Sequence, residues 1–489
     1  MRFVQKDIFS RIFWNICTNL DSEDFYIELR SSLNKSMSMD EQVELITQGD
    51  LRKALLKLAL PATAMLLGVM LFEIIDIFWV GKIGADAIAA VSVAAYLAWT
   101  AKALANITAG GSNTLISRSA GSKKWDRAVH WFWRGTLLAL IYSLFAASLG
   151  IFTMKAMLQF MELEYVVAEL AAGYLTIFYL AMPLIFLFSF FESVFRALGD
   201  ATTPAIITGF SLSLNMILDP ILIFGWFGAP ALGVTGASLA SAISEGIGVL
   251  LLAWRLSTTT LPFKNALPNR DKILADFGQI TKIGMPLALT GALFSLIYIF
   301  ITKIVAQFGT VQIAAMGIGQ RWEGLAYFVC IAMSTAVASM VGQNLGAGNV
   351  QRAKDAAYLA TKYLLAFTFL VSLIFVFAGD RMAFILTTDH AVIGATGRYL
   401  LIIGLFETAM AFELGLEGAF LGSGNTWPPF FISVPLTFAR IPVAWFLALN
   451  MGLGIDAVWW TLSASTLLKG ILMGFWFWRG KWVHTNVRI

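Results

Sequence analysis

Four polar residues lie within stretches that are otherwise apolar, and they are the residues best suited to chemistry. Glu73 and Asp76 are three apart, so a helix places them on neighbouring positions of one face. Asn215 and Asp219 are four apart, and Pro220 follows directly. Because a proline donates no backbone hydrogen bond, we expect a kink and a free carbonyl group beside this carboxylate. A carboxyl group in low dielectric binds a proton more readily than one in water, so these positions are candidates for a proton-coupled switch.

The structural alternative is that Asp76 and Asp219 are satisfied by hydroxyl groups, by water or by a place at a helix end. An internal repeat favours chemistry instead. Twelve residues recur with a spacing of 225, without a gap: Pro61, Val80, Gly84, Ile88, Ala89, Ala90, Gly121, Arg127, Ala128, Glu192, Gly199 and Pro204 return as Pro286, Val305, Gly309, Ile313, Ala314, Ala315, Gly346, Arg352, Ala353, Glu417, Gly424 and Pro429. The same spacing carries Asp76 to Ile301 and Asp219 to Ala444, so the second copy lacks both carboxylates. Residues needed only for packing would be expected in both copies.

The composition indicates which solvent surrounds these elements. With 58% hydrophobic residues, 13% charged residues and a mean hydropathy of +0.76, the chain has more apolar surface than a soluble fold of 489 residues can bury. A membrane-spanning helix needs about 20 apolar residues. Twelve such stretches occur, at 53–80, 87–114, 128–152, 164–189, 203–225, 235–255, 279–305, 311–337, 353–378, 392–418, 428–450 and 455–478. We therefore predict an all-α integral membrane protein of twelve transmembrane helices in two parallel six-helix repeats.

The basic residues predict the orientation, since Lys and Arg concentrate on the side that is not translocated. They gather in alternate loops and at the C-terminus: Arg118, Lys123, Lys124, Arg127, Arg255, Lys264, Arg270, Lys272, Lys282, Arg352, Lys354, Arg479, Lys481 and Arg488. Both termini are thus expected in the cytoplasm, with the protein in the plasma (inner) membrane. The net charge of +4 is a signal of this topology and not of nucleic-acid binding. The expected division is a cytoplasmic extension 1–50, an N-terminal lobe 51–255, a cytoplasmic linker 256–278, a C-terminal lobe 279–480 and a cytoplasmic tail 481–489.

The first fifty residues lie outside the repeat and allow three interpretations. Residues 3–16 have the spacing of a basic amphipathic helix that lies on a membrane surface. The same segment also fits an organelle-targeting sequence. Alternatively, translation starts at Met37 or Met39, because the chain runs from there straight into the first expected helix.

The second half has carboxylates at other places, and their role is open. Glu323 falls in the eighth expected helix, and Glu407, Glu413 and Glu417 fall in the tenth. One interpretation is a buried ion pair with Arg440 of the eleventh helix, and the other is a site for a cationic substrate. Enzymatic catalysis has little support, because the positions of His130, His390 and His484 in the sequence indicate no catalytic triad and no cluster of metal ligands. Cys17 and Cys330 offer no metal-binding motif, so no metal and no cofactor are expected.

Several segments, taken jointly, resemble one transporter family over about residues 47 to 480. They are Leu58-Ala59-Leu60-Pro61, Ile75-Asp76-Ile77-Phe78-Trp79-Val80-Gly81, Phe195-Arg196-Ala197-Leu198-Gly199-Asp200, Leu214-Asn215-Met216-Ile217-Leu218-Asp219-Pro220, Gly233-Val234-Thr235-Gly236-Ala237-Ser238-Leu239-Ala240 and Val341-Gly342-Gln343-Asn344-Leu345-Gly346-Ala347-Gly348. The family is that of the multidrug and toxic compound extrusion (MATE) transporters. The resemblance implies two six-helix lobes, a central cavity, and export by rocking between outward-open and inward-open states.

The resemblance also implies roles for single residues. Asp76, Asn215 and Asp219 match the proton site of the DinF-like branch, and Ser241 falls where members often have a threonine near that site. The sodium-coupled NorM-like branch has a glutamate in the seventh helix, whereas Ala288 to Ile301 contains no acid, which favours protons. Glu407 and Glu413 flank the place of that branch's aspartate in the tenth helix, so a second cation site stays open.

The sequence thus predicts a secondary antiporter, active as a monomer, that exports an amphipathic and preferably cationic organic compound in exchange for protons. Bending of the first helix near Pro61 would close the N-terminal pocket on protonation, and Pro220 is a second mechanical position. The alternatives are a sodium-coupled exporter of the same family and a flippase for lipid-linked precursors. The flippase would need a cationic groove, for which the central helices contain too few Lys or Arg residues. A membrane-embedded enzyme or receptor is the alternative from another class.

Overall fold

The computed structural model describes residues 37–161, 163–259 and 272–485, and nearly all of them are helical. The expected amphipathic helix at 3–16 lies outside this range. The chain divides into a unit of residues 1–42 and a unit of residues 43–489. In the described part of the first unit, the Ser38 amide donates to the Glu41 carboxylate and the Glu41 amide donates to the Ser38 hydroxyl. This reciprocal capping box begins helix α3 (Met39–Thr47).

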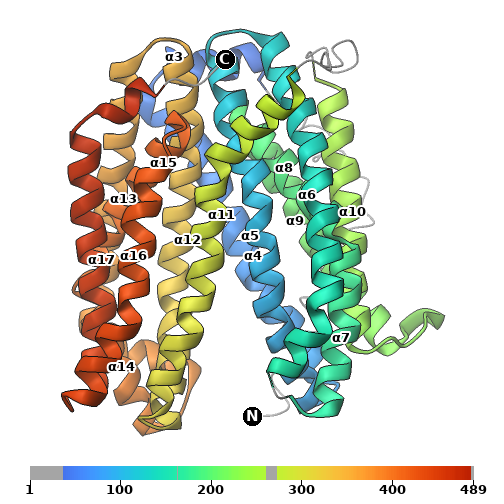
Figure 1. Ribbon diagram of the computed structural model, residues 1–489, viewed down its shortest axis with the longest axis vertical. Coiled ribbons are helices and arrows are strands. Elements are labelled where there is room, and N and C mark those ends of the chain that lie inside the picture. The colour runs from blue at the N-terminus through green and yellow to red at the C-terminus, as the bar shows by residue number, and fades with distance from the viewer. Residues whose placement is uncertain (1–36, 162, 260–271, 486–489) are drawn as a thin grey trace. The chain divides into compact units, whose positions relative to one another are not determined.

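The second unit contains the long helices. Those of the N-lobe are α4 (Leu51–Gly81), α5 (Ala85–Gly121), α6 (Trp125–Phe160), α7 (Tyr165–Leu180), α8 (Met182–Ala197), α9 (Thr202–Phe224) and α10 (Val234–Ser257). Those of the C-lobe are α11 (Ile273–Ala306), α12 (Thr310–Gly346), α13 (Val350–Leu386), α14 (His390–Gly404), α15 (Glu407–Ser423), α16 (Trp427–Trp445) and α17 (Ile455–Trp478). Figure 1 shows the N-lobe from blue to green and the C-lobe from yellow to red.

The predicted all-helical membrane fold is confirmed. Among the described residues, nine helices are long and apolar enough to cross a membrane, and two bent pairs, α7 with α8 and α14 with α15, bring the number to eleven. Each pair bends by 53° where one uninterrupted span was expected. Helix α17 is the twelfth span; its tryptophans, serines, threonines and Lys469 reduce its hydropathy. Residues 273–278, part of the expected linker, form the start of α11.

The two lobes meet through residues without side chains. Helix α5 packs against α11 and α12, and Figure 1 shows α11 beside α5. A methyl group on Gly121 would collide with the backbone carbonyl group of Gln343, and one on Gly346 would collide with the carbonyl group of Arg118. These contacts form a symmetric pair, since 121 + 225 = 346 and 118 + 225 = 343. Glycine is therefore needed at both places for the helices to approach so closely.

Helix α3 is held by the C-lobe although its chain continues into the N-lobe. The guanidinium group of Arg352 donates to the carbonyl oxygens of Ile46 at 2.9 Å and of Gly49 at 2.5 Å. The Asn344 side chain also donates to the Ile46 carbonyl at 3.2 Å. These donors satisfy the carbonyl groups that a helix end leaves free. Residues 43–49 thus connect the two lobes at the end where α12 meets α13.

Candidate functional site

The centre of the N-lobe holds a buried carboxylate on α9. Asp219 has no exposed surface, and Asn215 lies one turn before it with 4% exposure. When the amide nitrogen of Asn215 faces Asp219, it donates to both carboxylate oxygens, at 3.0 and 3.1 Å. The amide oxygen then accepts from the backbone and hydroxyl groups of Ser241 on α10, at 3.1 and 2.8 Å. This orientation satisfies both ends of the amide, and it brings together three of the predicted site residues.

A second carboxylate approaches this site from α4. Asp76 is half-buried and interacts electrostatically with Asp219 and with Glu73. Its Oδ1 atom is buried and has no hydrogen-bond partner among the described residues. A buried acceptor without a partner is costly, so this oxygen is a natural place for a proton or a water molecule.

One basic residue near these carboxylates was absent from the sequence-based interpretation. Lys102 of α5 interacts electrostatically with Glu73 and Asp76. Its Nζ atom lies 3.6 Å from a carboxylate oxygen of Glu245 on α10, and its side chain is 48% exposed. Lys102 also lines the central cavity. It is therefore the residue that connects the N-lobe carboxylates with that cavity.

The cavity has a volume of about 650 Å³ and lies mostly within the C-lobe. Its walls combine aromatic side chains with charged groups of both signs. The charged residues that line it are Lys102, Glu323, Glu407, Glu413, Glu417, Arg440 and Lys469. An apolar wall with a few polar anchors and this volume are typical of sites for small organic molecules. All four predicted glutamates of the second half line it, whereas Asp76 and Asp219 are not among its lining residues.

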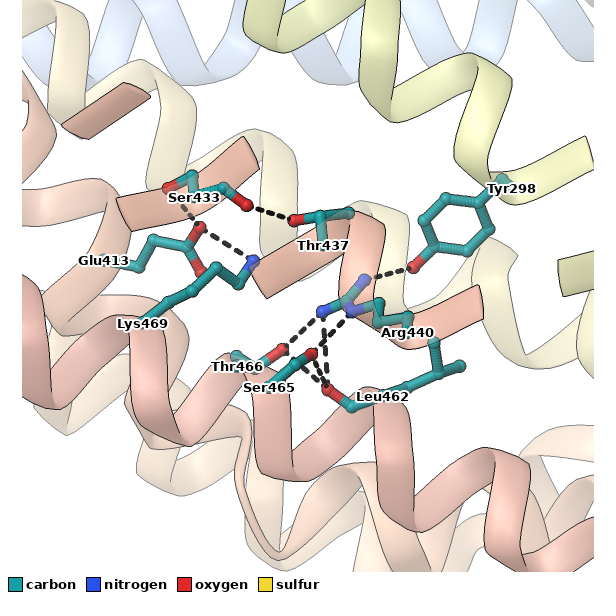
Figure 2. Close-up of polar contacts among 9 residues, drawn as sticks. All are labelled: Tyr298, Glu413, Ser433, Thr437, Arg440, Leu462, Ser465, Thr466 and Lys469. Carbon is teal, nitrogen blue, oxygen red and sulfur yellow. Dashed lines mark hydrogen bonds and ion pairs between the residues drawn. The ribbon is translucent and has the colours of Figure 1, made fainter. Parts of the chain in front are cut away.

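A buried ion pair, one of the two interpretations of the C-lobe carboxylates, is present among the described residues, but its basic partner is not Arg440. Glu413 pairs instead with Lys469 of α17, at 2.8 Å, and accepts a hydrogen bond from Ser433 at 3.2 Å (Figure 2). Both partners are buried. Lys469 was overlooked as a basic residue of the central helices. A search of the apolar spans for bases as well as acids would have found it.

The other C-lobe glutamates have different partners. Glu323 on α12 accepts a hydrogen bond from the hydroxyl group of Tyr399 at 3.0 Å. Glu407 is 3% exposed, and its Oε1 atom is buried without a partner among the described residues. It begins α15, at the bend after α14, where the N-terminal end of a helix favours a negative group. Among the described residues, no group of three or more His, Cys, Asp or Glu side chains is arranged to hold a metal ion.

The two mechanical positions lie within continuous helices. Pro61 is inside α4, which runs without interruption from Leu51 to Gly81. Pro220 directly follows Asp219 inside α9 and is buried. Each proline removes one backbone hydrogen bond from its helix, so each marks a point where bending costs less than elsewhere.

Comparison with known proteins agrees with the repeat. The sequence pattern of the MatE family matches residues 61–221 and again residues 286–446, more than half of the chain. Both ends of the two matches are 225 apart, as 286 − 61 and 446 − 221 show. The chain belongs to the MatE family. It is a multi-pass membrane transporter, as its homologues are, and not an enzyme.

Curated relatives and solved structures support this assignment over nearly the whole chain. The chain is 28% identical over 462 residues to a protein of Thermotoga maritima named "Probable multidrug resistance protein NorM", covering 93% of this chain and 97% of that protein. It is 26% identical over 422 residues to an FAD transporter of Shewanella oneidensis, covering 86% and 92%. A MOP superfamily transporter from Pyrococcus furiosus has the same fold, with a TM-score of 0.82, 22% identity, and coverage of 91% of this chain and 99% of that one.

Proposed function

We propose that this MATE transporter exports amphipathic organic compounds in exchange for protons, by alternating access of the central cavity. The observation that carries the proposal is the set of Asp219, Asn215 and Asp76. Asp219 and Asn215 are buried, Asp76 is half-buried, and the set has no carboxylate counterpart in the second repeat. A carboxyl group that is removed from water and interacts with a second one can take up a proton and thereby lose its charge.

When the amide nitrogen of Asn215 faces Asp219, the site suits a proton better than a sodium ion. The amide nitrogen of Asn215 donates to both carboxylate oxygens. A metal cation would bind the same oxygen lone pairs and would be repelled by the N–H groups directed at them. A proton can occupy one oxygen while the amide keeps its bond to the other.

The proposed cycle couples this proton to the substrate through the helices between them. Protonation of Asp219 and Asp76 removes the repulsion between two carboxylates of α4 and α9 and lets these helices approach. Pro61 lowers the cost of bending α4. Movement of α4 also changes the surroundings of Lys102, which lines the cavity, so substrate release and proton uptake are linked.

The class of substrate is not given by the names of relatives, which include a multidrug resistance protein and an FAD transporter. The cavity has charged groups of both signs among aromatic side chains. We therefore propose amphipathic organic compounds as substrates. We further propose that the protein works as a monomer in the plasma membrane. Both termini are proposed to lie in the cytoplasm, as its basic loops predict.

The proposal is tested by ethidium flux in proteoliposomes under an imposed pH gradient, with and without sodium. The wild type should export ethidium without sodium, and Asp219→Asn and Asp76→Asn should each abolish the gradient-driven component. Lys303→Gln, in an exposed position on α11, is the control and should keep the wild-type rate. Export that requires sodium and survives both substitutions would contradict the proposal and favour a cation site at Glu407 and Glu413. Gradient-independent movement of lipid-linked precursors alone would favour the flippase.

A further inference from the structure

Arg440 occupies in the second repeat the position of Asn215 in the first. The arithmetic is 215 + 225 = 440, and both residues lie within the segments that match the family. The residue one turn further on is Asp219 in the first repeat and Ala444 in the second. Each polar side chain also bonds to the last helix of its lobe, Asn215 to α10 and Arg440 to α17. The carboxylate site of one lobe therefore corresponds to a cationic site in the other.

The guanidinium group of Arg440 is held by uncharged groups (Figure 2). The residue is 3% exposed. Its four hydrogen bonds are as follows: Nε donates to the Ser465 hydroxyl at 2.5 Å, Nη2 donates to the Thr466 hydroxyl at 2.9 Å and to the Leu462 carbonyl at 3.3 Å, and Nη1 donates to the Tyr298 hydroxyl at 3.4 Å. A guanidinium group has five N–H groups, so one on Nη1 is left over. Within the described part of the chain, no carboxylate lies within 4.0 Å of this cation.

The other basic residues of the cavity differ from Arg440. Lys469 pairs with Glu413 at 2.8 Å, and Lys102 lies 3.6 Å from Glu245. Glu323 interacts electrostatically with Arg440, but it accepts the Tyr399 hydroxyl and stays outside ion-pair distance. A buried carboxyl group can become neutral by binding a proton, whereas an arginine keeps its charge. Arg440 is therefore a permanent buried charge that lacks a close counter-charge among the described residues, which is an unfavourable state for an empty cavity.

We infer that Arg440 binds an anionic head group of the transported compound, a carboxylate or a phosphate. The inference rests on the proposed function, because it names the substrate class of the same cavity. The N–H group left over on Nη1 can donate one charge-assisted hydrogen bond to either oxyanion. The apolar part of the compound would pack against the aromatic wall formed by Trp99, Phe294 and Phe328. The substrates thus include amphipathic organic anions, in addition to the cations that the sequence suggested.

The test compares probes that share one naphthalene body and differ in the head group. They are 1-naphthaleneacetate, 1-naphthyl phosphate, the neutral 1-naphthaleneacetamide and the cationic 1-naphthylmethylammonium. Binding to the purified full-length protein is measured by titration calorimetry. A charge-assisted hydrogen bond in a buried site should make at least one anion bind about tenfold more tightly than the amide. The two anions separate a carboxylate site from a phosphate site, and equal binding of anions and amide would overturn the inference.

Two variants test whether Arg440 causes the preference for anions. In Arg440→Gln, the ratio of anion to amide affinity should fall to about one. In the matched control Arg398→Gln, which removes an exposed arginine paired with Asp456, the ratio should stay at the wild-type value. The ratio is measured within each variant, so it does not depend on the fraction of folded protein. An Arg440→Gln protein that retains the full ratio would contradict the assignment.

A measurement on the wild type covers the case in which Arg440→Gln does not fold. Phenylglyoxal modifies arginine side chains, and mass spectrometry of the peptides reports each site. The preferred anion should slow modification of Arg440 at least about threefold and leave Arg398 unchanged in the same sample. Equal rates with and without the anion would overturn the inference. Ethidium flux in the same preparation separates the two hypotheses. Proton-driven flux without anion binding rejects only the inference that Arg440 binds an anion. Anion binding without proton-driven flux of any probe rejects the proposed exchange for protons.

Discussion

The N-lobe and the C-lobe share one scaffold and differ in the sign of their buried charge. At the equivalent positions, α9 has Asn215 and Asp219 where α16 has Arg440 and Ala444. Asn215 and Asp219 are buried and do not line the cavity, whereas Arg440 lines it. The comparison teaches that duplication kept the helices and that the polar residues then diverged; in the proposed mechanism, one lobe binds the proton and the other binds the substrate.

The contacts between the lobes did not diverge in the same way. Gly121 meets the carbonyl group of Gln343, and Gly346 meets the carbonyl group of Arg118, which is the same contact made twice. Symmetry is kept at this contact between the lobes and lost at the polar positions of α9 and α16. We therefore expect substitutions at the polar sites to affect one lobe, and substitutions at these two glycines to affect both lobes alike.

The largest expected effect falls on the buried ion pair of the C-lobe. Lys469→Met leaves Glu413 buried without its counter-charge and should lower the free energy of unfolding by about 3–5 kcal/mol. The double variant Glu413→Gln/Lys469→Met should recover most of this loss. Arg398→Gln, which breaks the exposed pair with Asp456, should cost about 0–1 kcal/mol. The measurement is chemical or thermal unfolding in detergent, and a Lys469→Met protein as stable as Arg398→Gln would show that the buried pair is not important for stability.

The next largest loss of stability should be equal for equivalent glycine substitutions in the two lobes. Gly121→Ala and Gly346→Ala each place a methyl group on a carbonyl of the other lobe and should cost about 1–3 kcal/mol. Gly317→Ala is the matched control, because it lies on α12 with no atom within 4 Å of the added methyl group. It should be neutral or slightly stabilising, since alanine favours a helix over glycine. Unfolding curves of the three variants give the comparison, and a large difference between Gly121→Ala and Gly346→Ala would break the symmetry.

A smaller effect, on proton-driven flux, is expected when Asn215 of the N-lobe is replaced by arginine, the residue at the equivalent position of the C-lobe. Asn215→Arg places a permanent cation one turn from Asp219, so the carboxylate should stay charged and stop exchanging protons. Gradient-driven flux should fall about tenfold, while binding of the anionic naphthalene probe stays at the wild-type value. Asn215→Gln, which keeps an amide, is the control and should retain more flux. Undiminished flux in Asn215→Arg would mean that Asp219 does not carry the proton.

The fold and the N-lobe set could be predicted because their signals are local or periodic. Twelve apolar stretches and a constant spacing of 225 indicate the repeat directly, and Asn215 and Asp219 are one helical turn apart. Ser241 followed only from the family resemblance. The bends between α7 and α8 and between α14 and α15 were missed, because both halves of each pair are apolar and the composition is continuous across the break.

The glutamates of the C-lobe cavity were predicted, but their partners could not be, because these contacts join distant parts of the chain. Lys469 and Glu413 are on different helices, and nothing in the spacing of 56 residues indicates a pair. One interpretation of the sequence paired Arg440 with a glutamate, yet the structure supplies hydroxyl and carbonyl groups. Which charges face one another depends on how α15, α16 and α17 pack, and this is a property of the tertiary structure.

The division of roles between the lobes is tested most directly by Asp219→Asn in proteoliposomes, with two assays on the same preparation. One assay measures flux driven by a pH gradient, and the other measures exchange of labelled for unlabelled substrate without a gradient. The account predicts that Asp219→Asn abolishes the response to the gradient and retains the exchange, since the cavity of the C-lobe is unchanged. A variant that still responds to the gradient like the wild type would contradict it.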